Sequence, residues 1–495
     1  MTAPVPPVVI LGFDALDPGI ARQMAEDGRL PHFASFFARA AYTTVTNPPG
    51  LVVGSTWPSF WTGLWPSRHG FYCYRQLEPK SYKVRRYTPL DIVAPPFWMV
   101  LAEAGRRVCI VDVPLVPLTR PRDGIHVIDW GTHDRMLSFD AWPAEVRTEI
   151  DEQAAPYPTQ GKCDDYAERG AWDELYDTLC LGIERKTDLN LRLLARGEWD
   201  LFASVYCESH CAGHQFWWAH DPEHPRYTAQ AGDPLLRVYE ALDRALGRML
   251  EQVPADATIM LLLSHGIGNH NGADHLLREI LIRLDDAYAP RSRAVVLRER
   301  IYRVLRRTWE RQWHRAREQQ LDPRWLDASR RFIRLPNNEL YGGVRLNLQG
   351  REPRGQLRAA DAEAATAWLE RELQALVHPD TGARVVRRVL RTRQLYSGEL
   401  RDGLPDLMVD WDRSAPIHAV TSPLVGTLRG EYEGPRTGDH RPTGMVFVRG
   451  AGVRPGRVPH DAKMVDLAPT VSAMAGGPPG DFDGVVIPTL PVADD

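Results

Sequence analysis

The chain has 495 residues, a formal net charge of −4 and an apolar content of 43%. This length suits a large α/β domain with insertions, and the apolar content is enough for a substantial core. The small net charge gives no indication of nucleic-acid or membrane binding, so we expect no nucleic-acid partner. No apolar run reaches the roughly 18 residues of a membrane span, so we expect no transmembrane segment.

The first predicted element is an apolar run over residues 8–13 that ends in the carboxylate of Asp14. It indicates a buried parallel strand with Asp14 at its C-terminal end, where open α/β sheets place their functional sites. The residues before it lack the basic region of a signal peptide. The six cysteines show neither disulfide-dense nor zinc-ribbon spacing. We therefore expect a cytoplasmic protein.

The next informative stretch runs from Gly54 to Gly70 and begins with small and hydroxylated residues. It predicts a helix with Pro58 in its first turn and with Ser55 or Thr56 at or just before the N-cap. A hydroxyl at that position faces free backbone N–H groups and the positive end of the helix dipole, where phosphate binds readily. An ordinary capped helix explains the stretch equally well.

Three later apolar runs have polar residues beside them. The candidate ligands at these strand ends are Glu208, His210 and His214, then Ser264 and His265, and finally His440. Helical periods over residues 173–195 and 235–253 separate the strands, which indicates a largely parallel sheet with helices on both faces. Aspartate and histidine at strand ends, together with a hydroxyl at a helix start, predict metal-assisted phosphoryl transfer.

Residues 291–334 differ in composition, because they are rich in arginine with interleaved tryptophans. They predict a helical insertion, and residues 1–290 and 335–495 would then form the catalytic domain. The insertion either contacts a polyanion, an acidic lipid surface or a partner, or forms a solvated helical cap. We favour the cap.

Taken in order, these motifs resemble the alkaline phosphatase superfamily, and within it the type I phosphodiesterase/nucleotide pyrophosphatase-like branch. The matching positions are Asp14, Thr56-Trp57-Pro58, Thr62-Gly63 to His69-Gly70, Glu208 to His214, His265-Gly266, His440 to Gly444, and Asp466 to Thr470. The resemblance implies a three-layer α/β/α sandwich with a largely parallel central sheet, here with a helical insertion. It also implies that Thr56 is the covalent nucleophile.

Two positions depart from the family pattern. Ser264 stands where the family usually has the aspartate of Asp-His-Gly, and His210 stands where it usually has an aspartate four residues before His214. The resemblance implies one cation shell of Asp14, Thr56 and His265, with Ser264 as a weak fourth member. The other shell consists of His210, His214 and His440, and three imidazoles suit Zn²⁺ with an open position. We expect one or two Zn²⁺ ions, with Mn²⁺ as the alternative.

Several further residues are candidates for contact with the substrate or a metal. The hydroxyl of Ser59 either donates to a phosphate oxygen or is a plain helix-surface serine. His133 and Arg135 lie in a polar loop that either closes over the substrate or is an ordinary exposed turn. Cys207 and Cys211 flank the presumed site, and we favour packing over soft-metal ligation for both.

Three residues near the strand ends have alternative roles. Glu208 either orients an imidazole or is itself a ligand. His270 or Asp274 either replaces the chelation lost at Ser264 or caps the helix that starts near Leu276.

The resemblance implies a metal-dependent hydrolase that cleaves a small-molecule phosphodiester or phosphomonoester through a covalent phospho-threonine. The alternatives are a phosphotransferase or mutase of the same fold, and a catalytically weak homologue that binds metal and anions. A sulfatase is disfavoured, because Thr56-Trp57-Pro58-Ser59-Phe60 lacks the oxidisable nucleophile and the arginine of that motif.

Overall fold

The computed structural model describes residues 5–133, 135–154, 156–159, 162–289 and 326–488. Within them a ten-stranded sheet has the strand order β19-β2-β18-β9-β1-β8-β5-β6-β7, and β20 also pairs with β2. The strands are β1 (Val8–Phe13), β2 (Ala41–Thr46), β5 (Val108–Val111), β6 (Ile125–Ile128), β7 (Asp140–Trp142), β8 (Leu201–Tyr206), β9 (Thr258–Leu263), β18 (Thr443–Arg449), β19 (Gly456–Arg457) and β20 (Ala462–Lys463).

The centre of this sheet is parallel, from β9 through β1, β8 and β5 to β6. Phe13, the last residue of β1, lies opposite both Tyr206 of β8 and Leu263 of β9. The three strands therefore end at the same level. This register brings Asp14 and Ser264 out of the sheet at one edge, as expected for parallel strands.

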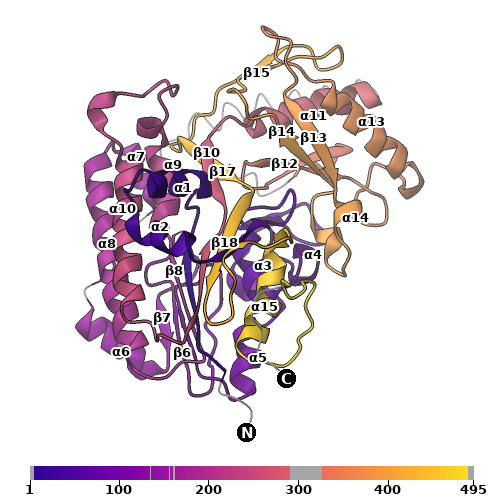
Figure 1. Ribbon diagram of the computed structural model, residues 1–495. Helices are drawn as coiled ribbons and strands as arrows, with labels where there is room; N and C mark the ends of the chain where they lie inside the picture. Colours follow the sequence, from indigo (N-terminus) through magenta and orange to yellow (C-terminus); the bar gives the residue numbers. More distant parts are fainter. Residues whose placement is uncertain (1–4, 134, 155, 160–161, 290–325, 489–495) are drawn as a thin grey trace.

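Successive residues of β1 face opposite layers: Leu11 and Phe13 pack into one core, and Val8 and Ile10 into the other. The first face is covered by α1 (Pro18–Glu26), α2 (Pro31–Phe37), α6 (Ala144–Gln153), α8 (Trp172–Leu194), α9 (Glu208–His220) and α10 (Pro234–Leu250). The other face is covered by α3 (Thr56–Thr62), α5 (Phe97–Glu103) and α15 (Leu467–Met474), and Figure 1 shows α3, α5 and α15 across the sheet from α6, α8 and α10. The predicted three-layer sandwich is confirmed.

A second, four-stranded antiparallel sheet has the order β11-β12-β14-β13 and a core of its own. Its strands are β11 (Phe332–Leu335), β12 (Tyr341–Leu346), β13 (Val386–Arg391) and β14 (Leu407–Trp411), with α11 (Asp274–Tyr288) and α13 (Ala362–Gln374) beside them (Figure 1). The other α-helices and strands in the described part of the chain are α4 (Pro66–His69), α7 (Cys163–Glu168), α14 (Thr392–Leu395), β3 (Arg75–Leu77), β4 (Val84–Arg86), β10 (Gly266–Asn269), β15 (Ala419–Val420), β16 (Leu428–Arg429) and β17 (Gly438–Arg441).

The arginine-rich segment differs from expectation at its C-terminal end. Residues 290–325, which hold most of the predicted insertion, lie outside the described residues. The described remainder leads into β11, because Phe332 packs into the second core and Arg330 forms ion pairs with Asp285 and Asp286 of α11.

A short antiparallel pair, β10 and β17, places His440 opposite Ile267. The four residues that follow His265 form β10. A Cβ atom on Gly438 would lie 2.2 Å from the carbonyl oxygen of Gly213 in α9, so only glycine lets β17 approach this helix so closely. Among the described residues, no helix is both long enough and apolar enough to cross a membrane.

Candidate active site

Asp14 lies at the centre of a buried polar cluster at the C-terminal edge of the parallel strands. Its Oδ2 lies 2.7 Å from Nδ1 of His210. Its Oδ1 accepts hydrogen bonds from Trp57 Nε1 and Ser264 Oγ, each at 2.9 Å. Burial by itself raises the pKa of Asp14, but His210, His265 and the Trp57 hydrogen bond outweigh it and hold the pKa well below its usual value. The carboxylate is therefore ionised at neutral pH.

Three histidines converge beside Asp14. Helix α9 places His210 and His214 one turn apart on the same face, and β17 adds His440. Nε2 of His214 lies 3.1 Å from Nε2 of His210 and 3.0 Å from Nε2 of His440. Ligands at 2.0–2.1 Å from a tetrahedral ion lie about 3.3 Å apart, so this spacing fits a three-imidazole metal site.

The protonation of this cluster favours metal binding. Nδ1 of His214 donates to the carbonyl oxygen of Gly438 at 2.7 Å, which leaves the Nε2 lone pair facing the other two rings. Burial lowers the pKa of His210 to about 4 and the pKa values of His214 and His440 well below the ordinary value. Burial also lowers the pKa of His265. At neutral pH the four rings are uncharged and can ligate a cation.

Within the described residues, the ligand atoms at this site form two groups. Inside each group, all of the ligand atoms lie within 4.8 Å of one another. One consists of His210, His214 and His440, and the other of Asp14, His210 and His265. From the sequence we expected His210 in the first group alone. The structure places it in both groups, since its Nδ1 faces Asp14 and its Nε2 faces His214.

Thr56 is the first residue of α3 and is fully buried. Its hydroxyl donates to Oδ1 of Asn47 at 2.7 Å, and Nδ2 of Asn47 donates to the carbonyl oxygen of Ser264 at 2.9 Å. Asn47 therefore joins the candidate nucleophile to the end of β9. We did not predict Asn47 from the sequence, although it directly follows β2 and precedes Pro48.

Arg436 was also missed. Its Nη1 lies 3.4 Å from Nε2 of His214, and its guanidinium forms an ion pair with Asp164 of α7 at 3.1 Å. It is one cause of the lowered pKa of His214, after burial. Arg436 brings a positive charge to the edge of the histidine cluster. Its segment has no helix or strand periodicity that would have indicated this position from the sequence.

Of the three predicted substrate contacts, only His133 lies against the histidine cluster, whereas Ser59 and Arg135 have other partners. The hydroxyl of Ser59 is buried and lies 3.1 Å from Nε2 of His69. Arg135 donates to the carbonyl oxygen of Thr159 at 3.0 Å. His133 does reach the cluster, with its ring centroid 4.0 Å from that of His210.

Glu208 lies in a buried ionic network and outside both groups of ligand atoms. It accepts a hydrogen bond from the hydroxyl of Tyr157, and its Oε1 lies 4.0 Å from Nζ of Lys186. Lys186 is fully buried, lies 3.2 Å from a carboxylate oxygen of Asp112 and donates to the carbonyl oxygen of Gly131 at 2.7 Å. This network ties the loop before His133 to the sheet.

His270 and Asp274 also lie outside both groups. The ring of His270 stacks on Tyr432 with centroids 3.7 Å apart, and its Nε2 lies 3.6 Å from Glu339. Asp274 forms an ion pair with Arg334. The structure therefore directs both residues to partners other than Asp14 and His265.

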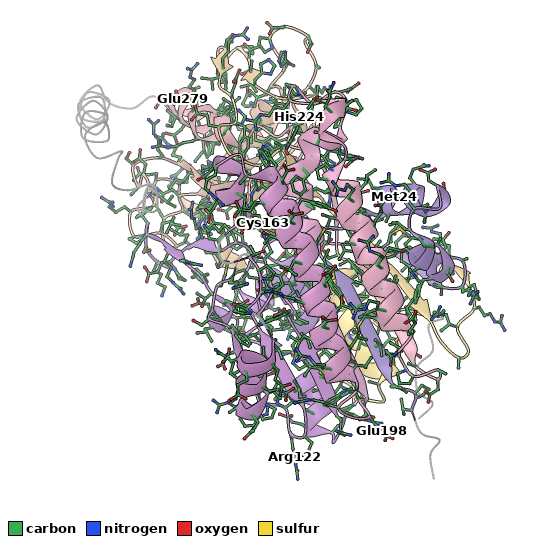
Figure 2. All side chains as sticks on the ribbon, turned by 90° about the vertical axis from the view of Figure 1, so that its left-hand side faces the viewer. Met24, Arg122, Cys163, Glu198, His224 and Glu279 are labelled. Atoms are coloured by element: carbon green, nitrogen blue, oxygen red, sulfur yellow. A yellow bond between two sulfur atoms is a disulfide. The ribbon has the colours of Figure 1, made fainter. Side chains whose placement is uncertain are left out.

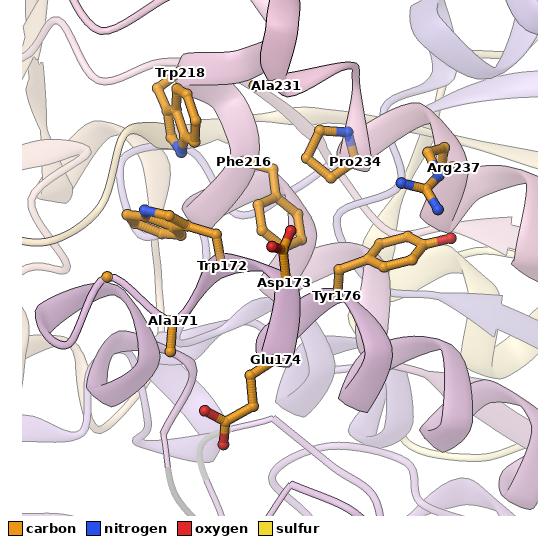
Figure 3. Close-up of a pocket in the computed structure, with 11 residues that line it drawn as sticks. Ala171, Trp172, Asp173, Glu174, Tyr176, Phe216, Trp218, Ala231, Pro234 and Arg237 are labelled. Atoms are coloured by element: carbon orange, nitrogen blue, oxygen red, sulfur yellow. The ribbon is translucent and has the colours of Figure 1, made fainter.

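Two features beside the cluster were not expected. A disulfide joins Cys163 of α7 to Cys211 of α9. Cys163 is labelled in Figure 2, where it lies among the helices that cover the sheet. A cavity of about 280 Å³ lies over α8, α9 and α10, where Trp172, Phe216 and Trp218 line it (Figure 3). None of the candidate ligands above lines this cavity.

An aspartate and histidines at the ends of parallel strands and a threonine at a helix start, together with the family match below, place the chain among the phosphoester hydrolases of the alkaline phosphatase superfamily. The family model for type I phosphodiesterase / nucleotide pyrophosphatase matches residues 8–425, and the chain belongs to this family. No curated protein sequence matches the chain significantly.

Two solved structures illustrate the fold. Phosphonoacetate hydrolase from Sinorhizobium meliloti 1021, in complex with phosphonoacetate, is 13% identical with a TM-score of 0.58, over 95% of this chain and 96% of its own. Murine ectonucleotide pyrophosphatase / phosphodiesterase 5 is 12% identical with a TM-score of 0.53, over 97% of each chain. At this level of identity the two similarities establish the fold.

Proposed function

We propose that the protein is a divalent-metal-dependent hydrolase of small-molecule phosphate esters, and that Thr56 forms a covalent phospho-threonine intermediate. The observation that carries the proposal is the convergence of Asp14, His210, His214, His265 and His440 at the edge of the sheet. The hydrogen bonds from Thr56 to Asn47 and from Asn47 to Ser264 tie the nucleophile to the same edge.

The donor set fits one or two divalent ions. His210, His214 and His440 would hold one, which suits Zn²⁺. Asp14 and His265 would hold a second, with His210 beside Asp14 and with Ser264 and Thr56 completing its shell. Mn²⁺ is the alternative, because carboxylate and hydroxyl oxygens suit it. A divalent ion supplies Lewis-acid stabilisation of phosphate oxygens and makes the alkoxide of a coordinated hydroxyl accessible.

The chain's own groups account for the two bond changes. Oγ1 of Thr56 attacks phosphorus, a P–O bond to Thr56 forms, the bond to the leaving oxygen breaks, and the proton lost by the Thr56 hydroxyl ends on the leaving alcohol. Asn47 accepts the hydrogen bond of the Thr56 hydroxyl and so orients an oxygen lone pair before attack. Water then cleaves the bond to Thr56 and releases phosphate or a phosphomonoester. Arg436 places a positive charge where the anionic substrate approaches the histidines.

Two relatives support this reading. A structure of the murine phosphodiesterase 5 is described as an inactive threonine-to-alanine variant in complex with AMP. The hydrolase from Sinorhizobium meliloti 1021 was solved with phosphonoacetate bound. Both ligands are small molecules that carry a phosphoryl or phosphonyl group.

The test combines metal analysis with a screen of phosphomonoesters, phosphodiesters, phosphonates and sulfate esters. We expect turnover of a phosphate ester by the Zn²⁺- or Mn²⁺-loaded protein, and a loss of about 10³-fold or more in Thr56→Ala. Thr62→Ala, at the other end of α3, is the matched control and should retain activity.

Other outcomes would favour the alternatives. Full turnover in Thr56→Ala would contradict the role of Thr56. Transfer of phosphate to an alcohol in preference to water would indicate a phosphotransferase or mutase. A folded, metal-loaded protein that is inert on every ester would indicate a catalytically weak binding homologue.

A further inference from the structure

A second cluster of metal-ligating side chains lies beside the histidines. Cys163 and Cys211 are buried, and Nδ1 of His133 lies 3.1 Å from Sγ of Cys211 and 3.7 Å from Sγ of Cys163. The three ligand atoms lie within 4.8 Å of one another. They come from α7, α9 and the loop before β7, so only the folded chain assembles them.

We propose that Cys163, Cys211 and His133 form a separate site for a soft divalent ion such as Zn²⁺ or Cd²⁺, and that this site is available when the disulfide is reduced. Ligands at about 2.3 Å for sulfur and 2.0–2.1 Å for nitrogen give N···S separations of about 3.5 Å around a tetrahedral ion. The two observed N···S distances lie on either side of this value.

The two sulfur atoms can also reach the separation that a tetrahedral ion requires. A tetrahedral ion would hold two thiolates about 3.8 Å apart. The Cα atoms of Cys163 and Cys211 lie 5.8 Å apart, so rotation of the two side chains gives this separation without moving the helices. The site then has two thiolates, one imidazole and an open fourth position.

The chemistry balances in two steps. A dithiol reductant transfers two electrons and two protons to the Cys163–Cys211 disulfide and becomes a disulfide itself. The two cysteine thiols then each lose a proton as the ion binds, so one divalent ion replaces two protons. Reoxidation of the thiolates by a small-molecule disulfide would restore the Cys163–Cys211 bond and expel the ion.

Other contacts hold the ligands together after reduction. Asp164, next to Cys163, accepts a hydrogen bond from Gln215 of α9 at 2.5 Å and forms an ion pair with Arg436 at 3.1 Å. The His133 ring also lies against His210 of α9. Because these contacts do not involve the disulfide, α7 and His133 remain beside α9 when the bond opens.

The sulfur ligands give the site a readout that the catalytic cluster lacks. The full-length protein would be reduced with excess dithiothreitol, desalted without oxygen and titrated with Co²⁺ and then Cd²⁺. We expect a thiolate-to-metal charge-transfer band that saturates at an amplitude corresponding to one two-thiolate site per chain, whatever amount of metal the histidine cluster also binds. The nitrogen and oxygen ligands around Asp14 produce no such band, so the result does not depend on the proposed hydrolase activity.

Variants identify the ligands. Cys163→Ser and Cys211→Ser should each abolish the saturating band, and His133→Ala should weaken Co²⁺ binding by about 10-fold or more. Cys180→Ser, at a half-buried cysteine outside the cluster, is the matched control and should keep the band. Alkylation of the reduced wild-type protein tests the same point without a substitution and should also remove it.

Three results would overturn the proposal. The first is reduced protein that gives no thiolate band with either metal. The second is a band that persists in Cys163→Ser or after alkylation. The third is a disulfide that resists dithiothreitol in the folded protein, because the ligands would then never become available.

Discussion

Nδ1 of His210 lies 2.7 Å from Oδ2 of Asp14, and this contact joins helix α9 to the end of β1. Nε2 of the same ring lies 3.1 Å from His214. His210 thus uses both of its nitrogens within the cluster, one toward each group of candidate ligands. The imidazole of His210 is therefore shared by the two groups.

The first prediction concerns this double role. His210→Ala should weaken metal binding at both groups, whereas His440→Ala should affect only the group of three histidines. Metal content after dialysis and isothermal titration with Zn²⁺ would measure this, and circular dichroism would check the fold of both variants. Equal metal content in the two variants would contradict the double role.

The second prediction concerns Ser264, whose hydroxyl donates to Asp14. A neutral hydroxyl offsets less of a cation's charge than a carboxylate does, so the Asp14/His265 group should bind its ion weakly. Added Zn²⁺ or Mn²⁺ should raise the activity of purified protein, and Ser264→Asp should raise occupancy at this group. Elemental analysis and anomalous scattering would measure occupancy, with Ser264→Ala as the control. Two fully occupied ions in dialysed wild-type protein, with no change in Ser264→Asp, would exclude this explanation.

The third prediction concerns Asn47, which accepts the hydrogen bond of the Thr56 hydroxyl. Asn47→Ala should lower kcat by about 10²-fold, because the nucleophile loses its orientation. KM and metal content should change little. Steady-state kinetics and elemental analysis would separate these effects, and an unchanged kcat would show that Asn47 does not position Thr56.

The fourth prediction concerns pH and His69, which is fully buried. Burial lowers the pKa of His69 from 6.5 to about 3. The unfolded state therefore binds a proton below pH 6.5 that the folded state does not bind until about pH 3, and stability falls as pH decreases through this window. The slope from this residue is at most about 1.4 kcal/mol per pH unit.

Urea unfolding of the wild type and of His69→Gln between pH 7 and 4.5 would measure this slope as the difference between the two proteins, because other buried histidines also contribute to the wild-type slope. His69→Gln keeps an amide near Ser59 but does not titrate, so its free energy of unfolding should vary less with pH than that of the wild type. Identical pH profiles would show that His69 does not contribute.

The fifth prediction concerns Lys186, the buried cation between Asp112 and Glu208. Lys186→Met keeps most of the side-chain volume but leaves two carboxylates in the interior without their cation. We expect a loss of about 3–5 kcal/mol in the free energy of unfolding. Lys83→Met, at an exposed lysine, should change stability by less than about 0.5 kcal/mol in the same urea experiment.

The sequence by itself determined the parts of the fold and of the candidate site that depend on local order. Apolar runs that end in Asp14 and Ser264 predicted parallel strands, because a buried strand and the residue that follows it are contiguous in the chain. His210 and His214 are four residues apart, so a single helical turn places them on the same face, and this could be predicted from the sequence. The ordered motifs were sufficient to identify the family.

Only the tertiary structure decided which side chains meet. The position of His440 depends on the pairing of β17 with β10, and the double role of His210 depends on the packing of α9 against the end of β1. The contacts of Asn47 with Ser264, of Arg436 with His214 and of Cys163 with Cys211 each join residues that are distant in sequence. Such contacts are set by strand register and helix packing across the whole chain, and no local run of residues encodes them.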